Sequence, residues 1–154
     1  MLTVSLVVCA IVALATADDP AANHTVANKA TCPANWKEHN HRCYYFEAST
    51  KNWADAEKQC QTMGGNLVSV HSGDEHKFIQ TLTQSDAWIG GSGCQVAGAW
   101  FWIDGTAMSE TFWCPQKPDN TLPECCLQTN SQVGKCWDDI ACDTLLPFVC
   151  AKSM

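Results

Sequence analysis

The sequence predicts an α+β fold with two helices, small antiparallel sheets and a long disulfide-pinned loop, cross-linked by five disulfides. Three observations support this fold class. Residues 52–83 contain two helical patterns, each with a capping residue at its start. Residues 87–150 contain short aromatic and β-branched runs separated by turns, as strands do. Ten of the eleven cysteines follow residue 31, which is enough for five cross-links in one domain.

The N-terminus is expected to be a secretory signal peptide, residues 1–17. This segment carries no charge, and an apolar run from Leu6 to Ala15 ends in the small residues Ala15-Thr16-Ala17. A membrane anchor is the alternative, but about 17 uncharged residues are at the short limit for spanning a bilayer. Cleavage would leave 137 of the 154 residues, the size of one domain. We therefore expect a secreted, extracellular protein with no membrane insertion after cleavage.

A polar leader, residues 18–31, is expected between the signal and the domain, which begins at Cys32. The leader contains one candidate glycosylation site, Asn23-His24-Thr25. The aromatic run Cys43 to Glu47 then predicts a strand.

Two helices follow this strand. Asn52 is a candidate N-cap, Trp53, Ala56 and Cys60 share one helical face, and Gly64-Gly65 ends the helix. Residues 66–70 predict a short strand. Ser72 to Glu75 is typical of a capping box and opens a second helix that extends to about Thr83. The expected order is therefore strand, helix, strand, helix.

The second half of the chain predicts short strands around a long loop. The candidate strands are residues 87–91, 99–104, 125–128, 135–138 and 147–150. The loop from Ser109 to Pro123 has little periodicity, contains three prolines and is bracketed by Cys114 and Cys125. Loops of this length in compact domains usually carry function. The tryptophans at strand and helix positions are expected in the core, whereas Trp113 beside the loop cysteine is not assigned.

Charge and motifs argue against several functions. The net charge is −7, and the nine Lys and Arg residues form no basic run, so no nucleic-acid partner is expected. The spacing of His71, Glu75 and His76 is wrong for a His-Glu-x-x-His metalloprotease, and both histidines are expected to be solvated. No nucleophile elbow is present, so we expect no catalytic residues and no enzyme. Zinc is disfavoured because paired Cys-x-x-Cys knuckles are missing.

Several motifs in this order resemble C-type lectin domains, over Cys32 to Lys152. They are Trp53-Ala54-x-Ala56, Trp88-Ile89-Gly90-Gly91, a Pro-Asp loop and Cys136-Trp137-Asp138-Asp139. Within that superfamily, three further features are most similar to fish type II antifreeze proteins: the adjacent Cys125-Cys126, the run Val96-Ala97-Gly98-Ala99-Trp100 and the ending Val149-Cys150-Ala151-Lys152. The resemblance implies the pairs Cys32–Cys43, Cys60–Cys150, Cys94–Cys125, Cys114–Cys136 and Cys126–Cys142.

The resemblance also implies a candidate calcium site on the loop. Its oxygen ligands would be Asp119, Glu124, Asp138 and Asp139. Sugar-binding members read Glu-Pro-Asn or Gln-Pro-Asp where this chain has Lys117-Pro118-Asp119. A lysine there removes an oxygen ligand and adds a positive charge, so we expect its ammonium to replace calcium beside Asp119, Glu124 and Asp138. No cofactor is therefore expected, although the four retained acids leave Ca²⁺ as an alternative.

The expected partner is ice, which a rigid surface of short side chains can bind with little loss of entropy. The candidate ice-binding residues are Asp119, Asn120, Thr121, Leu122 and Glu124. The resemblance places Thr121 at a threonine position of the family's ice-binding loop, whereas Pro123 replaces a second threonine. Two alternatives remain open: a secreted lectin that binds glycans in mucosal defence, calcium-dependent or not, and a lectin-fold protein that binds another protein.

Overall fold

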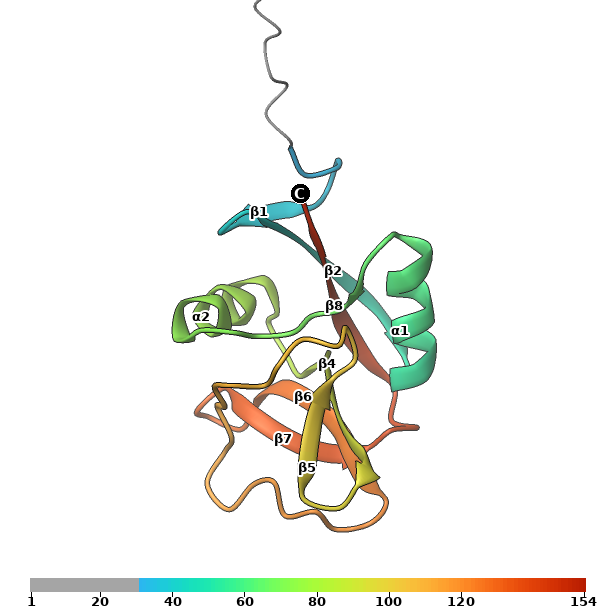
Figure 1. Ribbon diagram of the computed structural model, residues 1–154, viewed down its shortest axis with the longest axis vertical. Coiled ribbons are helices and arrows are strands. Elements are labelled where there is room, and N and C mark those ends of the chain that lie inside the picture. The colour runs from blue at the N-terminus through green and yellow to red at the C-terminus, as the bar shows by residue number, and fades with distance from the viewer. Residues whose placement is uncertain (1–30) are drawn as a thin grey trace, which may run out of the picture.

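The computed structural model describes residues 31–154, so the predicted signal peptide, almost all of the leader and Asn23 lie outside the described residues. Eight strands and two helices make up this part of the chain (Figure 1). In chain order they are β1 (Lys37–His39), β2 (Arg42–Lys51), α1 (Trp53–Thr62), β3 (Asn66–Leu67), α2 (Gly73–Leu82), β4 (Ala87–Val96), β5 (Ala99–Trp102), β6 (Glu124–Ser131), β7 (Cys136–Ala141) and β8 (Leu146–Ser153).

All strands belong to one mixed sheet, which corrects the expectation of several small antiparallel sheets. The main order is β1-β2-β8-β4-β6-β7, with β3 paired to β8 and β5 paired to β4. The ten-residue strand β4 joins the parts because it pairs with β5, β6 and β8. Its pairing with β8, at Trp88 and Phe148, is parallel. β2 and β8 lie side by side, so the two ends of the domain meet (Figure 1).

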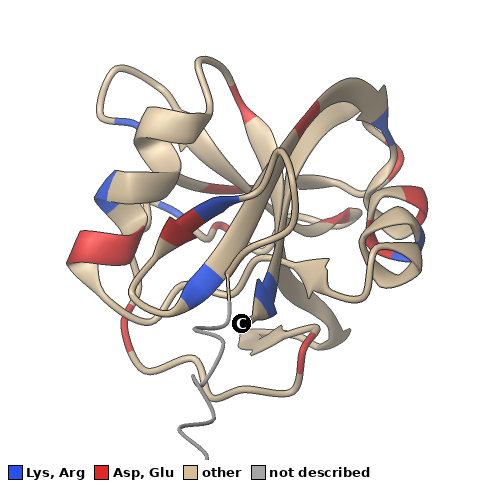
Figure 2. Cartoon of the chain, turned by 90° about the horizontal axis from the view of Figure 1, so that it is seen from above, with Lys and Arg blue, Asp and Glu red and all other residues tan. Residues whose placement is uncertain are grey.

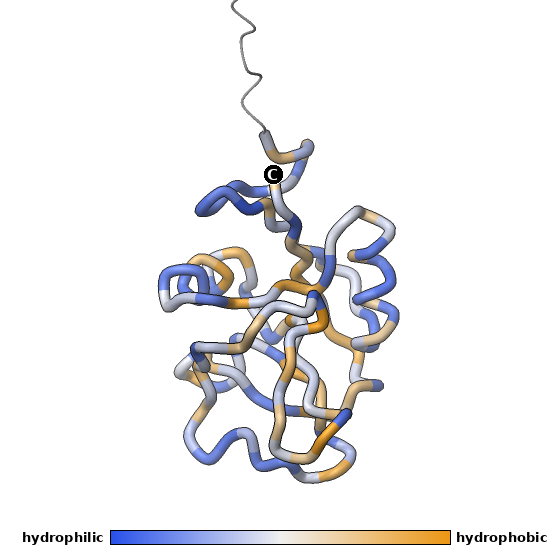
Figure 3. Tube along the Cα trace, viewed as in Figure 1, coloured by the Kyte–Doolittle hydropathy of each residue, from blue (hydrophilic) through white to orange (hydrophobic). Residues whose placement is uncertain are grey.

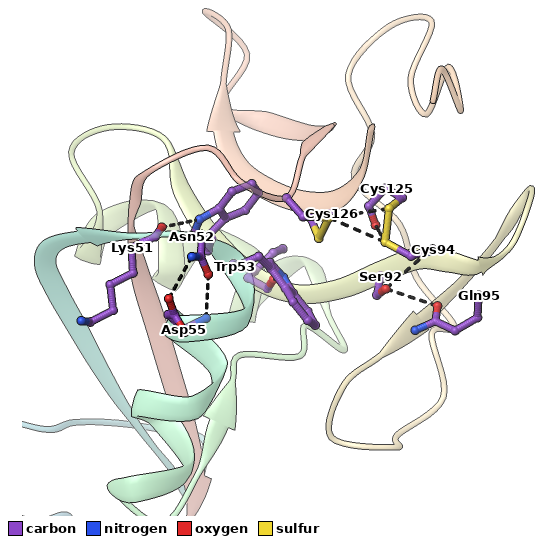
Figure 4. Close-up of a disulfide and its surroundings, with 12 residues drawn as sticks. Lys51, Asn52, Trp53, Asp55, Ser92, Cys94, Gln95, Cys125 and Cys126 are labelled. Atoms are coloured by element: carbon purple, nitrogen blue, oxygen red, sulfur yellow. Dashed lines mark hydrogen bonds between the residues drawn. A yellow bond between two sulfur atoms is a disulfide. The ribbon is translucent and has the colours of Figure 1, made fainter. Parts of the chain in front are cut away.

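The two helices begin where the sequence predicts them. The backbone N–H of Asp55 donates to the Asn52 side chain at 2.8 Å (Figure 4), and that of Glu75 donates to the Ser72 hydroxyl at 3.1 Å. The capping box is only half formed, however. The Glu75 carboxylate accepts the backbone N–H of His71 at 2.6 Å instead of returning to Ser72. It turns inward because Arg42 and Tyr44 also donate to it.

The strand expected over residues 66–70 is shorter in the structure. Only Asn66 and Leu67 pair regularly with β8. Val68 then lies between two strands, donating to the Val149 carbonyl at 2.9 Å and accepting from the Gly90 N–H at 2.8 Å. The apolar run is therefore buried as a bridge between β8 and β4 rather than as a regular strand.

The expectation of core tryptophans holds for three of the five: Trp88, Trp102 and Trp137 are buried, whereas Trp53 and Trp100 are half-buried. Trp113 packs from the loop against the cluster that contains Trp102 and Trp137. The ring of Trp137 meets that of Trp102 edge to face, with centroids 5.4 Å apart.

His76 contradicts the expectation of a solvated histidine. It is buried and stacks on Phe112 of the loop with ring centroids 4.4 Å apart. Burial lowers the pKa of this histidine. The loop is thus packed onto α2 through an aromatic contact that local sequence does not reveal.

All five disulfides that the resemblance implied are formed. They join Cys32 to Cys43, Cys60 to Cys150, Cys94 to Cys125, Cys114 to Cys136 and Cys126 to Cys142. Cys125 is bonded to Cys94 of β4 (Figure 4), and Cys126 is bonded to Cys142 just after β7, so the start of β6 is fixed on two sides. The sulfurs of these two bridges lie within 4.8 Å of one another, but because each sulfur is already paired they are not zinc ligands. Across residues 31–154, no helix is both long and apolar enough to cross a membrane.

Candidate functional site

The long loop is an exposed irregular segment, largely hydrophilic (Figure 3), that disulfides hold in place. Between β5 and β6 it forms no regular element apart from an isolated bridge of Trp113 to Trp137. Residues 119–123 are all exposed, and Leu122 keeps 87% of its surface accessible. Figure 1 shows this part of the loop at the end of the molecule opposite β1 and the C-terminus. A rigid, exposed loop of this kind is suited to recognition.

The edge strand β7 supports the first half of the loop. The Trp137 N–H donates to the Phe112 carbonyl, and the Cys114 N–H donates to the Trp137 carbonyl, both at 2.8 Å. The Cys114–Cys136 bridge fixes the same stretch covalently. The otherwise unpaired edge of the sheet is therefore covered by the loop.

Lys117 lies at the centre of the predicted metal-ligand cluster. Its Nζ is 2.8 Å from Asp119 Oδ2 and 2.9 Å from Asp138 Oδ1. The same nitrogen is 3.6 Å from Asp139 Oδ1 and 3.7 Å from Glu124 Oε2. The structure thus brings all four predicted ligands together around an ammonium group whose side chain is only 18% exposed.

The charges in this cluster shift two pKa values in the directions expected for ion pairs. Desolvation opposes the charged form of Lys117, but hydrogen bonds to Asp119 and Asp138 and the nearby carboxylates outweigh it and raise the pKa of Lys117. The hydrogen bond from Lys117, with a further one from the Thr121 backbone, lowers the pKa of Asp119 to about 2. Both groups are therefore charged at neutral pH, and the ammonium is retained in the cluster.

Asp139 accepts backbone hydrogen bonds, a role that its interpretation as a calcium ligand did not predict. Its side chain is buried, and its two oxygens accept the backbone N–H groups of Asp119 at 3.2 Å and Asn120 at 3.0 Å. Asp138 differs, because its second oxygen accepts only from the side chains of Gln128 and Ser131. The two adjacent acids of β7 therefore have different roles, although their spacing in the sequence looks equivalent.

The candidate ice-binding residues divide into two groups. Asn120, Thr121 and Leu122 are exposed. Asp119 and Glu124 instead point their carboxylates toward Lys117. A turn closes behind these residues, where the Glu124 N–H donates to the Thr121 carbonyl at 2.7 Å. The exposed part of the site is thus a short polar and apolar segment above an internal ion-pair cluster.

A separate cavity of about 600 Å³ lies near the ends of β2 and β8, and no residue of the 115–124 segment lines it. Its walls include Arg42, His71 and Asp104, which are already connected to one another through Ser69. Lys and Arg residues are scattered among acidic ones around the molecule rather than gathered on one face (Figure 2). The loop therefore combines exposure, rigidity and an organised charge cluster in a way that this cavity does not.

Comparisons with known proteins agree with this fold. Residues 49–152 match the Lectin C-type domain family. The type-2 ice-structuring protein of Hemitripterus americanus is 46% identical over 162 residues, covering 99% of both chains. A calcium-independent type II antifreeze protein has a similar structure, with a TM-score of 0.78 and 46% identity, covering 80% of this chain and 95% of that one. The calcium-free form of a calcium-dependent type II antifreeze protein has a TM-score of 0.77 and 46% identity, covering 79% of this chain and 100% of that one. Overall similarity therefore does not distinguish the two calcium classes, and the residues at the loop must.

Proposed function

Because the chain belongs to the C-type lectin domain family and, within it, to the type-2 ice-structuring proteins, we propose that it is a secreted antifreeze protein. It binds ice through the 119–124 segment and slows crystal growth without calcium. The observation that carries this proposal is the ammonium of Lys117 in contact with Asp119 and Asp138, beneath an exposed loop. Binding, rather than catalysis, is the activity.

The loop has the physical properties that ice binding requires. Ice offers no charged groups, so recognition depends on a surface that is already ordered and on side chains that lose little entropy. Asn120, Thr121 and Leu122 are exposed, and the Cys94–Cys125 and Cys114–Cys136 bridges bracket them. We assign these three residues to the ice contact, with Asp119 and Glu124 at its edge.

Calcium does not fit the cluster as it stands. A bound calcium ion needs carboxylate oxygens at about 2.3 to 2.6 Å, and the Lys117 ammonium already contacts the same oxygens of Asp119 and Asp138. The two cations would repel each other strongly at such short range. We therefore propose that Lys117 supplies the positive charge that neutralises this cluster.

A glycan-binding lectin is the second candidate, because the matching family is named for lectins. A calcium-dependent lectin holds its sugar by letting two vicinal hydroxyls complete the coordination of the metal. Lys117 occupies the centre of the cluster formed by Asp119, Glu124, Asp138 and Asp139, so this mode of sugar binding is disfavoured. Glycan binding without a metal remains an outcome of the test below.

The proposal is tested by measuring thermal hysteresis and ice-crystal shape with calcium and with EDTA. We expect equal hysteresis and faceted crystals in both conditions, and no retention of the protein on mannose or galactose resins. Loss of hysteresis in EDTA would overturn calcium independence, and sugar retention without hysteresis would favour the lectin.

A matched pair of variants tests the loop itself. Thr121→Leu should reduce hysteresis because it removes the one hydroxyl of the 119–124 segment, whereas Thr50→Leu changes an exposed threonine on β2 and should not. Equal hysteresis in the two variants would contradict the assignment of Thr121 to the ice contact.

Export is part of the same proposal. Five disulfides persist in an oxidising compartment, which supports secretion. We propose a mature chain that begins at Asp18 and a folded domain from Cys32 to Lys152. Mass spectrometry of the secreted protein would show whether cleavage follows Ala17 and whether Asn23 carries a glycan.

A further inference from the structure

We propose that Asp139 is a positioning residue, which shapes the ice-contacting segment from beneath without touching ice. This inference rests on the proposed function, because it concerns the same loop. Asp139 is fully buried, and each of its carboxylate oxygens accepts a backbone N–H from the loop. The donors are two consecutive residues, Asp119 and Asn120. One side chain therefore restrains both the position and the direction of the chain at this point.

The restraint extends to Thr121, which is assigned to the ice contact. The backbone at Asn120 has φ of 52°, in the left-handed region that Asn adopts more readily than most residues. Beyond it, the Thr121 N–H donates to Asp119 Oδ1 at 3.0 Å. Asp139 thus holds the backbone of Asp119 and Asn120, and Asp119 in turn holds Thr121. Displacing Asp139 would change where the Thr121 hydroxyl lies.

The support itself is rigid. Asp139 lies on β7 opposite Leu127 of β6, and Leu127 is buried in the core. Nearby, Cys136 on the same strand is bonded to Cys114. Because the strand is fixed on both sides, the carboxylate of Asp139 is held where it can accept the two loop N–H groups.

Asp139 acts differently from Lys117. The distance from Lys117 Nζ to Asp139 Oδ1 is 3.6 Å, beyond ordinary hydrogen-bond length. The two backbone donors are closer, so they are the main partners of this buried carboxylate. Lys117 balances the charge of the cluster, while Asp139 orders the backbone.

Asp138 offers a matched control, because it is adjacent, acidic and 2.9 Å from Lys117 but accepts no loop backbone N–H. Asp138→Asn and Asp139→Asn each remove one negative charge beside the same ammonium. Only Asp139→Asn removes an acceptor from the loop backbone, since the new amide can accept one N–H but its NH₂ opposes the other. Asp138 has the closer ion pair with Lys117, so a larger effect of Asp139→Asn reports the backbone contact and not the charge.

The experiment measures amide hydrogen exchange at residues 119 and 120, together with thermal hysteresis and the melting temperature. In Asp139→Asn we expect exchange at these two amides to rise about 10- to 100-fold, with a loss of most hysteresis. Asp138→Asn should leave both amides as protected as in the native chain. Equal exchange in the two variants, or full hysteresis in Asp139→Asn, would overturn the proposal.

A second test uses the native protein and therefore does not require any variant to fold. Residues 119 and 120 are exposed, so slow exchange of their amides requires the hydrogen bonds to Asp139. Exchange as fast as that of an unprotected loop amide would refute the contact directly. If the native chain shows protected amides but no hysteresis, the proposed ice-binding function fails while the positioning role of Asp139 stands.

Discussion

Replacing Lys117 with glutamine should convert the loop cluster into a calcium site. The change removes the ammonium from among four carboxylates, which lie 2.8 to 3.7 Å from its nitrogen. It also supplies an amide oxygen of the kind that calcium accepts as a ligand. The variant should therefore gain calcium binding, and its loop should depend on the metal for order.

The magnitude follows from the distances. Calcium and the ammonium compete for the same oxygens of Asp119 and Asp138, so binding requires Lys117 to move. An ammonium that stays near the cluster would lie about 4.5 Å from the ion and repel it by about 7 kcal/mol at an effective dielectric of about 20. This lowers affinity about 10⁵-fold, so a site with an intrinsic Kd of about 10⁻⁴ to 10⁻³ M would not bind calcium at millimolar concentrations. Without the ammonium we expect a Kd of about 10⁻⁴ to 10⁻³ M.

Isothermal titration calorimetry with calcium measures this difference directly. The native protein should give no binding heat up to about 10 mM calcium, whereas Lys117→Gln should approach saturation over the same range. Lys77→Gln is the control, because it removes the same charge from an exposed position on α2. In Lys117→Gln without calcium, the pKa of Asp119 should also rise from about 2 toward its ordinary value, as NMR titration would show. Micromolar calcium binding by the native chain, or none by Lys117→Gln, would refute the reasoning.

Three further predictions concern the scaffold. In Gly90→Ala the new Cβ would lie 2.5 Å from the Leu67 carbonyl oxygen, so urea unfolding should show a loss of about 1 to 3 kcal/mol. Burial lowers the pKa of His76, so its neutral form stabilises the fold above the ordinary pKa of 6.5, and this contribution should be lost as pH falls through the lowered value. Thermal unfolding at several pH values checks this, and a melting temperature that rises on acidification would contradict it. Replacing Cys94 and Cys125 by alanine opens a cross-link of 31 residues, which should cost about 4 kcal/mol and reduce hysteresis, whereas unchanged stability would argue against the entropic account.

Much of the fold could be predicted from local patterns. The caps at Asn52 and Ser72 need only a side chain and a backbone N–H three residues apart, so short motifs identify them. The resemblance to C-type lectin domains supplied the disulfide pairing, and hence the rigidity of the loop. Sequence also singled out Lys117 correctly as the cation that contacts Asp119, Glu124 and Asp138, because its charge departs from the family's loop pattern.

Other features depend on contacts between distant segments. A run such as residues 66–70 looks like a strand, but whether it pairs or bridges depends on which strands flank it in space. His76 appears solvated in sequence because its partner, Phe112, lies 36 residues further along the chain. Likewise, the Glu75 side chain leaves its own helix cap because Arg42 and Tyr44 approach it from β2.

The sequence by itself determined the helix starts through short spacings, and its resemblance to C-type lectin domains implied the five cross-links and the cation among four acids. Only the tertiary structure decided which acid neutralises charge and which holds the backbone. Asp138 and Asp139 are adjacent and chemically alike, yet successive residues of a strand meet different surroundings. One of them faces the ammonium and polar side chains, and the other is buried beneath two loop N–H groups.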